Sequence, residues 1–387
     1  MKLLEPRRPF LLVETKEQLR KATDALKKSA DVAVDAERAS GFRYGSSAYL
    51  IQFATTEEIF LIDPTHFQSD SFLLLNSSIQ SKPWLLHSAT QDLPCLAEIG
   101  LKPTALFDTE LAARLCGIER FGLGSIALEL LDFEMAKEHS AADWSIRPIK
   151  PEMLIYAALD VDVMHELKTA LENRLEELGR TSWAEQEFKR LLSFQPKPVS
   201  KDPWRNLPGI SKIKETRKLQ IAAALFQVRD QIARENDVAP GRLIPDRSIM
   251  AAVNQAPTTK KELAANKEFQ GRASRSMLNT WWEAISNSTT LSISEPELDP
   301  NHIPNHRNWE KRFPDAHQRL QTIRPLVAQV ADELGIAIEI LLSPDALRRV
   351  CFDPKDDLVA QLTELGARPW QIELVAPVIQ SGLALGD

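Results

Sequence analysis

Two carboxylates stand two residues apart at the end of a short apolar run near the N-terminus. Residues 32–34 (Val-Ala-Val) are typical of a buried strand, and Asp35 and Glu37 follow directly. Because side chains two residues apart on a strand project from the same face, we expect both acids to point the same way. Neighbouring carboxylates repel each other and are costly to ionise unless a cation lies between them. The pair alone is equally typical of a solvated strand end, so its interpretation depends on further acids.

Three further residues, which come later in the chain, can join this pair. Asp92 follows a short apolar run at 84–86 and precedes a helical pattern, a position that is also typical of a helix N-cap. Tyr156 and Asp160 are four residues apart in a helical stretch, so their side chains lie on one face. Alone, that second pair also fits a core tyrosine beside a surface aspartate. Taken together, the acids can converge at one edge of a sheet.

Such a cluster would select a particular kind of metal ion. Oxygen ligands without Cys or paired His favour hard cations, Mg²⁺ or Mn²⁺. Two such ions about 4 Å apart activate a water on one side of a phosphodiester and stabilise the leaving oxygen on the other. The phenol of Tyr156 would orient the attacking water. The residue types therefore predict metal-dependent phosphodiester hydrolysis.

These motifs resemble those of the ribonuclease D group in the DEDD family of 3′→5′ exonucleases. Asp35 and Glu37 match the first motif, Asp92 the second, and Tyr156 with Asp160 the third, in the spacing of the tyrosine subtype. Residues 141–148 (Ala-Ala-Asp-Trp-Ser-Ile-Arg-Pro) are similar to the stretch ahead of the third motif. The resemblance implies that these five residues are catalytic, and that the four acids bind two divalent cations, Mg²⁺ or Mn²⁺.

The first motif departs from the family pattern, which is Asp-Thr-Glu-Phe. Here Ala36 and Arg38 occupy the second and fourth positions. Ala36 should face away from the metals, whereas Arg38 either contacts a phosphate near the terminal nucleotide or is a surface arginine. Gln52, His87 and Lys137 are further candidates for substrate contact, and His87 fits equally well as a hydrogen-bonded histidine at a strand end.

The elements that must position these residues alternate between β and α patterns. Apolar runs predict strands at 49–54, 59–64, 84–87 and 106–108 in addition to the one that carries Asp35. Helical periodicity appears at 16–28, 92–99, 109–116, 125–131 and from 151 to about 192. This order predicts an α/β domain with a mixed sheet flanked by helices. By resemblance, the domain is RNase H-like.

Two all-α blocks follow after Pro-rich gaps. The first resembles the helical domain shared by RecQ-type helicases and ribonuclease D (HRDC), in residues such as Arg229-Asp230 and Ile244-Pro245-Asp246. Such domains are non-catalytic and help to hold nucleic acid. The expected boundaries are an exonuclease domain at 1–195, a linker at 196–210, an HRDC domain at 211–287, a linker at 288–307, and a second, divergent HRDC-like domain at 308–387.

Charge is segregated along the chain. The net charge of the 387 residues is −7, but residues 201–290 contain 15 Lys and Arg against 9 Asp and Glu, a balance of +6 that leaves −13 for the rest. A basic block suits sequence-independent contact with phosphates, although a chance fluctuation on a solvated helical surface has the same composition. The three scattered cysteines and the lack of a membrane-spanning run or signal peptide predict a cytoplasmic protein without an obligate membrane or protein partner.

The resemblance therefore predicts a two-metal-ion 3′→5′ exoribonuclease. Its substrates would be RNA 3′ ends, tRNA precursors foremost, and its products 5′-mononucleotides. Two alternatives remain at this point: a DNA 3′→5′ exonuclease in repair, and a non-catalytic nucleic-acid-binding protein that retains the fold. The metal chemistry does not depend on the sugar, so only a contact to the 2′-hydroxyl would separate RNA from DNA.

Overall fold

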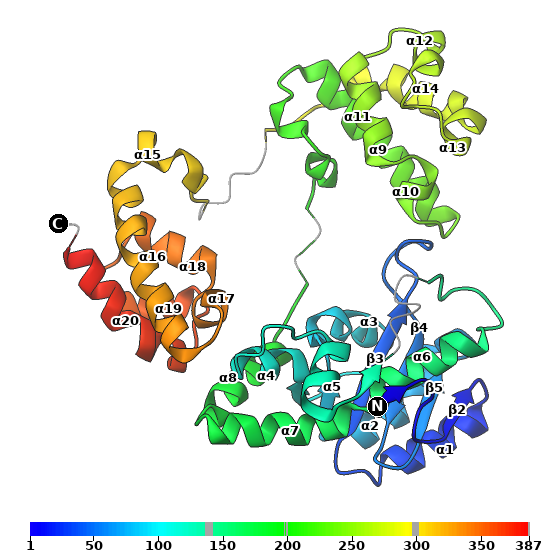
Figure 1. The fold of residues 1–387 in the computed structure, drawn as a ribbon. Helices are drawn as coiled ribbons and strands as arrows, with labels where there is room; N and C mark the ends of the chain where they lie inside the picture. The colour runs from blue at the N-terminus through cyan, green and yellow to red at the C-terminus, as the bar shows by residue number, and fades with distance from the viewer. Residues whose placement is uncertain (136–141, 197, 199, 296–301, 386–387) are drawn as a thin grey trace.

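The computed structural model describes the whole chain except residues 136–141, 197, 199, 296–301 and 386–387. Figure 1 shows three parts: an α/β domain that contains the N-terminus and two helical domains. No helix in the described part of the chain combines the length and apolar character that crossing a membrane requires.

The α/β domain is built on a mixed six-stranded sheet with strand order β2-β5-β4-β3-β6-β7. Strand β4 is antiparallel to both β3 and β5, while the pairs β2–β5, β3–β6 and β6–β7 are parallel. This arrangement confirms the predicted mixed sheet. The strands span Phe10–Val13 (β2), Val32–Arg38 (β3), Ala48–Ala54 (β4), Ile59–Ile62 (β5), Pro83–Leu86 (β6) and Ala105–Asp108 (β7). A separate parallel pair joins β1 (Lys2–Leu3) to β8 (Glu134–Met135).

Strand β2 is the one strand of this sheet that the sequence patterns do not predict. Its four residues alternate poorly between exposed and buried, because an edge strand has only one neighbour. By contrast, all four residues of β5 are buried, since helices and strands cover it on every side. Pairing with β5 in parallel register is what orders β2, and that interaction is not visible in the local sequence.

Helices cover the sheet and carry one of the motifs. The most important is α6, which packs across β3, β4 and β5, while α7 contacts β6 and α8 contacts β7. The helical stretch expected from 151 to about 192 is divided into these three helices. The bounds are Lys16–Leu26 (α1), Leu73–Ile79 (α2), Leu93–Glu98 (α3), Thr109–Leu115 (α4), Leu123–Leu131 (α5), Pro151–Asp162 (α6), Met164–Glu177 (α7) and Thr181–Leu192 (α8).

The first helical domain has its own hydrophobic core. Trp281 lies fully buried in it, so this residue packs in the core and does not present a face to bases. Trp204, Leu207 and Ile210 belong to the same core, so the domain begins within the segment expected to be a linker. Its helices are Thr216–Glu235 (α9), Pro240–Leu243 (α10), Asp246–Gln255 (α11), Lys260–Ala265 (α12), Arg272–Ser276 (α13) and Leu278–Asn287 (α14).

The C-terminal helical domain packs directly on the α/β domain, and the two share one hydrophobic core. The rings of Trp183 and Trp370 stack with centroids 4.5 Å apart, and Arg368 Nε lies 2.6 Å from Glu187 Oε1. Trp370 Nε1 donates to the same carboxylate at 2.9 Å. The helices are Trp309–Arg312 (α15), Pro314–Leu334 (α16), Ile338–Leu341 (α17), Pro344–Phe352 (α18), Leu358–Glu364 (α19) and Pro369–Ala384 (α20).

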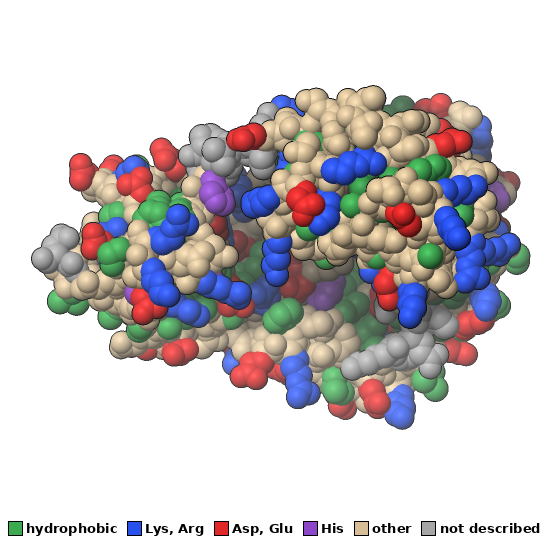
Figure 2. Space-filling model, turned by 90° about the horizontal axis from the view of Figure 1, so that it is seen from above, with side chains coloured by type: hydrophobic (Ala, Val, Ile, Leu, Met, Phe, Trp, Pro, Cys, Tyr) green, Lys and Arg blue, Asp and Glu red, His purple; other side chains and the backbone are tan. Residues whose placement is uncertain are grey.

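The first helical domain contacts the α/β domain at a different place, the loop between β3 and β4. The hydroxyl of Tyr44 donates to Asp230 Oδ1 at 3.0 Å, and the backbone N–H of Tyr44 donates to Asp237 Oδ1 at 3.2 Å. Arg242 Nε donates to the carbonyl of Gly41 at 2.8 Å. Both helical domains therefore contact the α/β domain. Figure 2, which views the molecule from above relative to Figure 1, shows a recess with Lys and Arg side chains along its rim.

We predict that Glu187→Ala weakens the attachment of the C-terminal domain. Glu187 is only 5% exposed and is the acceptor for both Arg368 and Trp370, so its loss leaves the buried indole N–H of Trp370 without this partner and removes the ion pair with the half-buried Arg368. Such a loss costs about 1–3 kcal/mol in the free energy of unfolding. Denaturant unfolding measures this cost. Glu185→Ala, at an exposed position on the same helix, is the control; equal stability of the two variants would contradict the role given to Glu187.

Candidate active site

Strand β3 and helix α6 bring three of the predicted acids together. One ligand oxygen from each of Asp35, Glu37 and Asp160 lies within 4.8 Å of the others. The first two acids share a face of β3 because they are two residues apart, and α6 reaches them because it packs across that strand. Residues 125 positions apart in the sequence thus meet in one cluster.

The pairing of β3 with β4 is irregular at this cluster. The register shifts between Glu37 and Arg38, which marks a β-bulge or similar irregularity. Bulges increase the local twist and change the direction of side chains, and they are frequent beside active sites. The side chain of Arg38 therefore does not have to follow the alternation that places Asp35 and Glu37 on one face of the strand.

Asp92 lies in the segment that follows β6, the strand next to β3. The chain leaves β6, makes one turn of 3₁₀ helix at Ala89–Gln91, and enters α3 at Asp92. The Asp92 side chain makes no capping hydrogen bond, so the N-cap interpretation does not account for it. Instead Asp92 is 4% exposed, and the nearby charge of Asp35 adds to burial in raising the pKa of its carboxyl group.

Tyr156 lies one helical turn before Asp160 on α6, and its phenol forms a hydrogen bond with the Asp160 carboxyl group. The buried ring of Trp144 packs beside the tyrosine with centroids 6.3 Å apart. Arg147 anchors this segment to the sheet, because its Nη2 donates to Asp63 Oδ1 at 2.9 Å and to the carbonyl of Tyr49 at 2.7 Å. The stretch ahead of the third motif thus supports the tyrosine.

Burial raises the pKa of every acid in the cluster, and repulsion from neighbouring carboxylates adds to this effect for Glu37, Asp92 and Asp160. Burial is the largest cause in each case, and it raises the pKa of Asp35, Asp92 and Asp160. Burial and the charges of the other three acids raise the pKa of Glu37 to about 10. Arg38 opposes this effect, but one partly exposed guanidinium does not balance four carboxylates. The cluster needs additional positive charge before all its members can ionise.

The donor set fits a divalent cation. All ligand atoms are carboxylate oxygens, the ligands that Mg²⁺ and Mn²⁺ prefer, and no Cys or His joins the described cluster. A second described group with ligand-like spacing contains Glu14, Asp63 and His66. There, however, the buried Asp63 already pairs with Arg147, which supplies the positive charge that a cation would.

The four candidates for substrate contact have different outcomes. Arg38 Nη2 lies 3.6 Å from Asp92 Oδ1, and another of its nitrogens donates to the carbonyl of Gln91. His87 fits the alternative interpretation of a hydrogen-bonded histidine at a strand end. Its Nδ1 is 3.0 Å from Thr109 Oγ1, and burial lowers its pKa to about 4. Lys137 lies outside the described residues.

Gln52 requires a correction. It pairs with Asp35 across β3 and β4, but its side chain is fully buried, so it does not contact RNA in this structure. Neither its amide oxygen nor its amide nitrogen has a hydrogen-bond partner among the described residues. Gln52 lies opposite Asp35 in the register of β3 and β4, so the two side chains share one face of the sheet.

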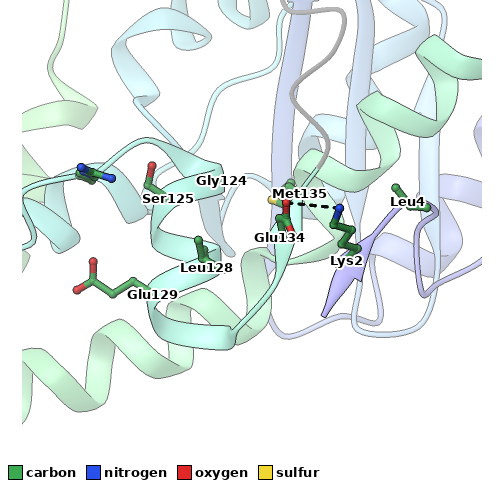
Figure 3. Close-up of a pocket in the computed structure, with 9 residues that line it drawn as sticks. Lys2, Leu4, Gly124, Ser125, Leu128, Glu129, Glu134 and Met135 are labelled. Atoms are coloured by element: carbon green, nitrogen blue, oxygen red, sulfur yellow. Dashed lines mark ion pairs between the residues drawn. The ribbon is translucent and has the colours of Figure 1, made fainter.

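A cavity of about 620 Å³ lies apart from the acids, at the short β1–β8 pair (Figure 3). None of the predicted site residues lines it. Its lining contains both signs of charge, with an ion pair between Lys2 and Glu134 at 4.0 Å, so it does not favour an anion or a cation. Its lining residues are Lys2, Leu4, Arg120, Gly124, Ser125, Leu128, Glu129, Glu134 and Met135.

Comparison with known families accounts for all three parts of the chain. The family described as 3′-5′ exonuclease matches residues 10–176, and the HRDC domain family matches residues 218–285. Residues 302–383 match a different family, described as 3′ to 5′ exonuclease C-terminal domain. The second helical domain is therefore matched as an exonuclease C-terminal domain and the first as an HRDC domain.

Curated relatives have the same name across bacteria. Ribonuclease D of Bartonella henselae is 25% identical over 353 residues, which cover 89% of this chain and 84% of that protein. Ribonuclease D of Xanthomonas oryzae pv. oryzae is 28% identical over 341 residues, which cover 83% and 86%. The chain belongs to the ribonuclease D family. Enzymes of this family are divalent-metal-dependent 3′→5′ exoribonucleases, so the predicted family and enzyme class are confirmed.

Two solved structures share the whole architecture. Escherichia coli RNase D covers 97% of this chain with 99% of its own, at a TM-score of 0.70 and 22% identity, which supports the fold. A protein from Bifidobacterium adolescentis covers 99% of both chains at a TM-score of 0.90 and 33% identity. The arrangement of three domains is therefore common to these proteins and this ribonuclease D family member.

We predict that the stability of the metal-free protein falls as pH rises. The folded pKa of Glu37 is about 10 against an ordinary 4.5, so between these values the folded state holds more protons than the unfolded state. Stability then decreases with increasing pH across that window. Thermal unfolding midpoints from about pH 6 to about pH 9 in chelator measure the decrease. Saturating Mg²⁺ and the Glu37→Gln variant should each reduce the slope; identical slopes in all three samples would contradict the cause given.

Proposed function

We propose that Asp35, Glu37, Asp92 and Asp160 bind two divalent cations, Mg²⁺ or Mn²⁺, and that the site hydrolyses RNA from its 3′ end. The observation that supports this most directly is the convergence of Asp35, Glu37 and Asp160 within 4.8 Å at a position where their pKa values are raised. Ions bound there would activate a water and stabilise charge on the leaving oxygen.

The protein's own groups supply orientation and further charge. The phenol of Tyr156 is held by Asp160, with its pKa raised by burial and by that neighbouring carboxylate, so it stays protonated and can donate to or accept from the attacking water. Arg38 lies on the Asp92 side of the cluster, where its partly exposed guanidinium can meet a phosphate of the terminal nucleotide. Each group acts on the reacting end of the RNA and not on a base.

We further propose RNA 3′ ends as the substrate, with tRNA precursors foremost and 5′-mononucleotides as the products. The relatives are named as ribonucleases, and the E. coli enzyme is described as an exoribonuclease involved in structured RNA processing. The basic balance of the HRDC region supports binding to phosphates along the RNA. The three cysteines are all unpaired, which suits the reducing cytoplasm as the compartment of the reaction.

DNA exonuclease activity and a non-catalytic role are the alternatives. The convergence of Asp35, Glu37 and Asp160, with Tyr156 beside Asp160, supports a catalytic role over a non-catalytic one. Matched RNA and DNA oligomers of one sequence separate the two nuclease activities. A preference for the RNA supports the proposal, while equal or faster DNA cleavage would favour the repair alternative.

We predict that Asp35→Asn and Asp160→Asn each abolish cleavage but leave RNA binding largely intact. Each substitution removes one anionic ligand without changing the shape of the side chain, and chelator should have the same effect on the parent. Release of labelled 5′-mononucleotides measures cleavage, and fluorescence anisotropy measures binding. Glu98→Gln, an exposed acid on α3, is the matched control. Cleavage that survives either aspartate substitution would mean that the catalytic site lies elsewhere.

We also predict that Tyr156→Phe lowers kcat by roughly 10²-fold, the usual contribution of one group that assists proton transfer. The ring still packs against Trp144, and only the hydroxyl is lost. Affinity for Mn²⁺ should also fall, by up to about tenfold, because the phenol hydrogen-bonds the proposed ligand Asp160; kcat is therefore compared at saturating Mn²⁺. Single-turnover kinetics and calorimetry check the two values. Tyr49→Phe on β4 is the control, and an unchanged kcat in Tyr156→Phe would remove the tyrosine from the mechanism.

A further inference from the structure

The C-terminal end of α6 is held by two arginines that the predicted motifs do not include. Helix α6 ends at Asp162, two residues after Asp160. Arg7 Nε and Arg8 Nη1 each lie 2.9 Å from a carboxylate oxygen of Asp162, and the backbone N–H of Arg7 donates to the same carboxylate at 3.1 Å. Both guanidinium groups also donate to the backbone carbonyl of Asp162.

This arrangement satisfies groups that a helix end leaves open. The last carbonyls of a helix have no partner within the helix, and cations are favourable there. Asp162 is fully buried, and its carboxylate takes hydrogen bonds from both arginines. Because a guanidinium is a rigid fork of donors, two of them fix the direction of this helix end more closely than one lysine would.

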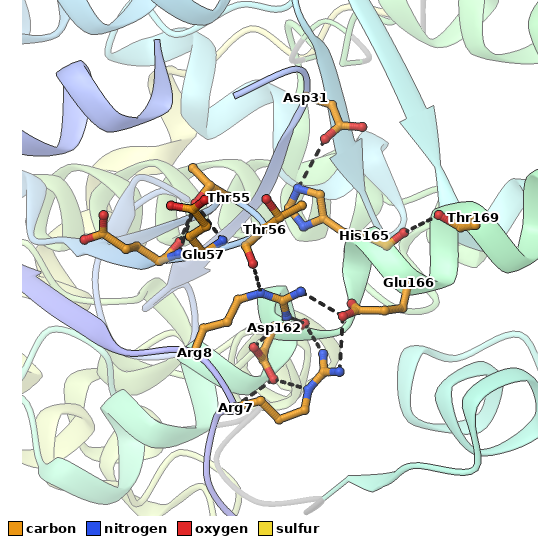
Figure 4. A network of polar contacts seen from close by, with 11 residues as sticks. Arg7, Arg8, Asp31, Thr55, Thr56, Glu57, Asp162, His165, Glu166 and Thr169 are labelled. Atoms are coloured by element: carbon orange, nitrogen blue, oxygen red, sulfur yellow. Dashed lines mark hydrogen bonds and ion pairs between the residues drawn. The ribbon is translucent and has the colours of Figure 1, made fainter. Parts of the chain in front are cut away.

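The same arginines attach the helix end to other elements (Figure 4). Arg8 Nε donates to the carbonyl of Thr56, in the turn between β4 and β5, at 2.9 Å. Glu166, on the first turn of α7, lies 2.7 Å from Arg8 Nη2 and 3.2 Å from Arg7 Nη1. The junction of α6 and α7 is thereby tied to the sheet through the N-terminal segment.

A second contact in Figure 4 ties α7 to the strand that carries the other acids. Asp31, at the start of β3, lies 3.2 Å from His165 Nε2 and 2.9 Å from Lys168 Nζ. The chain then reaches Asp35 after three residues of β3. The two ligand-bearing elements, β3 and α6, are therefore both attached to the first turns of α7.

We propose that Arg7 and Arg8 are positioning residues for the metal site, which act through Asp162 to set Asp160 against Asp35 and Glu37. The inference rests on the proposed function, because the distances between the acids matter only if the acids bind metal ions together. Asp160 and Asp162 are separated by a rise of only about 3 Å along the helix, so a shift of the helix end moves the ligand. Metal–ligand distances tolerate only about 0.2 Å.

The test is the double substitution Arg7→Gln/Arg8→Gln, with Arg8→Lys as a conservative variant. Residues that orient metal ligands usually contribute about 10–100-fold to metal affinity. We expect Mn²⁺ binding by calorimetry, without RNA, to weaken about tenfold in the double variant and less in Arg8→Lys. The Mn²⁺ concentration for half-maximal cleavage should rise in parallel, while kcat at saturating Mn²⁺ recovers most of the parental value.

A matched control separates positioning from stability. Arg319 holds the end of another helix in the same manner, because its Nε and Nη2 donate to the carbonyls of Cys351 and Phe352 at 2.8 and 3.2 Å. Arg319→Gln should lower the thermal unfolding midpoint without changing Mn²⁺ affinity. Circular dichroism confirms that each variant is folded, and Arg8→Lys keeps the test valid if the double variant does not fold.

The outcomes distinguish this inference from the proposed function. A parent that binds Mn²⁺ and cleaves RNA, with variants that bind Mn²⁺ equally well, would overturn the role of Arg7 and Arg8 alone. A parent that binds no divalent cation would overturn the proposed function and this inference together. A selective loss of Mn²⁺ affinity in the arginine variants, absent from Arg319→Gln, supports the inference.

Discussion

Repulsion among buried carboxylates is the constraint on which this structure depends. Asp92 is buried and Asp35, Glu37 and Asp160 are half-buried beside it, and burial together with the neighbouring carboxylates raises the pKa of Glu37, Asp92 and Asp160. A fold selected only for stability would not place them together. In the proposed function, divalent cations bound by these acids would neutralise the repulsion, so metal binding would offset the electrostatic cost of bringing the acids together.

Resisting that repulsion requires rigid supports on every element that carries an acid. Strand β3 is central in the sheet, with β4 and β6 as its neighbours, and α6 is packed across it. Arg147 anchors the segment that supports Tyr156, and Arg7 with Arg8 anchors the end of α6. Arginine recurs in these supports because each guanidinium can satisfy several buried acceptors at once.

Local patterns in the sequence were sufficient for the parts of the site that depend on one element. The spacing of Asp35 and Glu37 on a strand, and of Tyr156 and Asp160 on a helix, predicts which side chains share a face. Asp92 was ambiguous because an acid before a helix is usually a cap, and only the position of β6 beside β3 shows otherwise. The convergence itself depends on packing between elements far apart in the chain.

Features that depend on tertiary contacts were missed or wrongly interpreted. Strand β2 forms because β5 is beside it, and the importance of Arg7 appears only when Asp162 is placed next to it. Gln52 lies on the predicted face but beneath covering structure, so the same alternation that located it could not show its burial. Periodicity reports the direction of a side chain relative to its own element and nothing about what lies opposite.

The loop between β3 and β4 gives the ribonuclease D architecture one more property. It starts just after Arg38, at the end of the strand that carries Asp35 and Glu37. Two aspartates of the HRDC domain accept hydrogen bonds from Tyr44 in this loop. If a nucleic acid bound to the HRDC domain shifted this loop, the strand that carries Asp35 and Glu37 would shift with it. Any such coupling between the HRDC domain and the proposed metal site would be reciprocal, so metal binding would change the affinity for nucleic acid by the same factor.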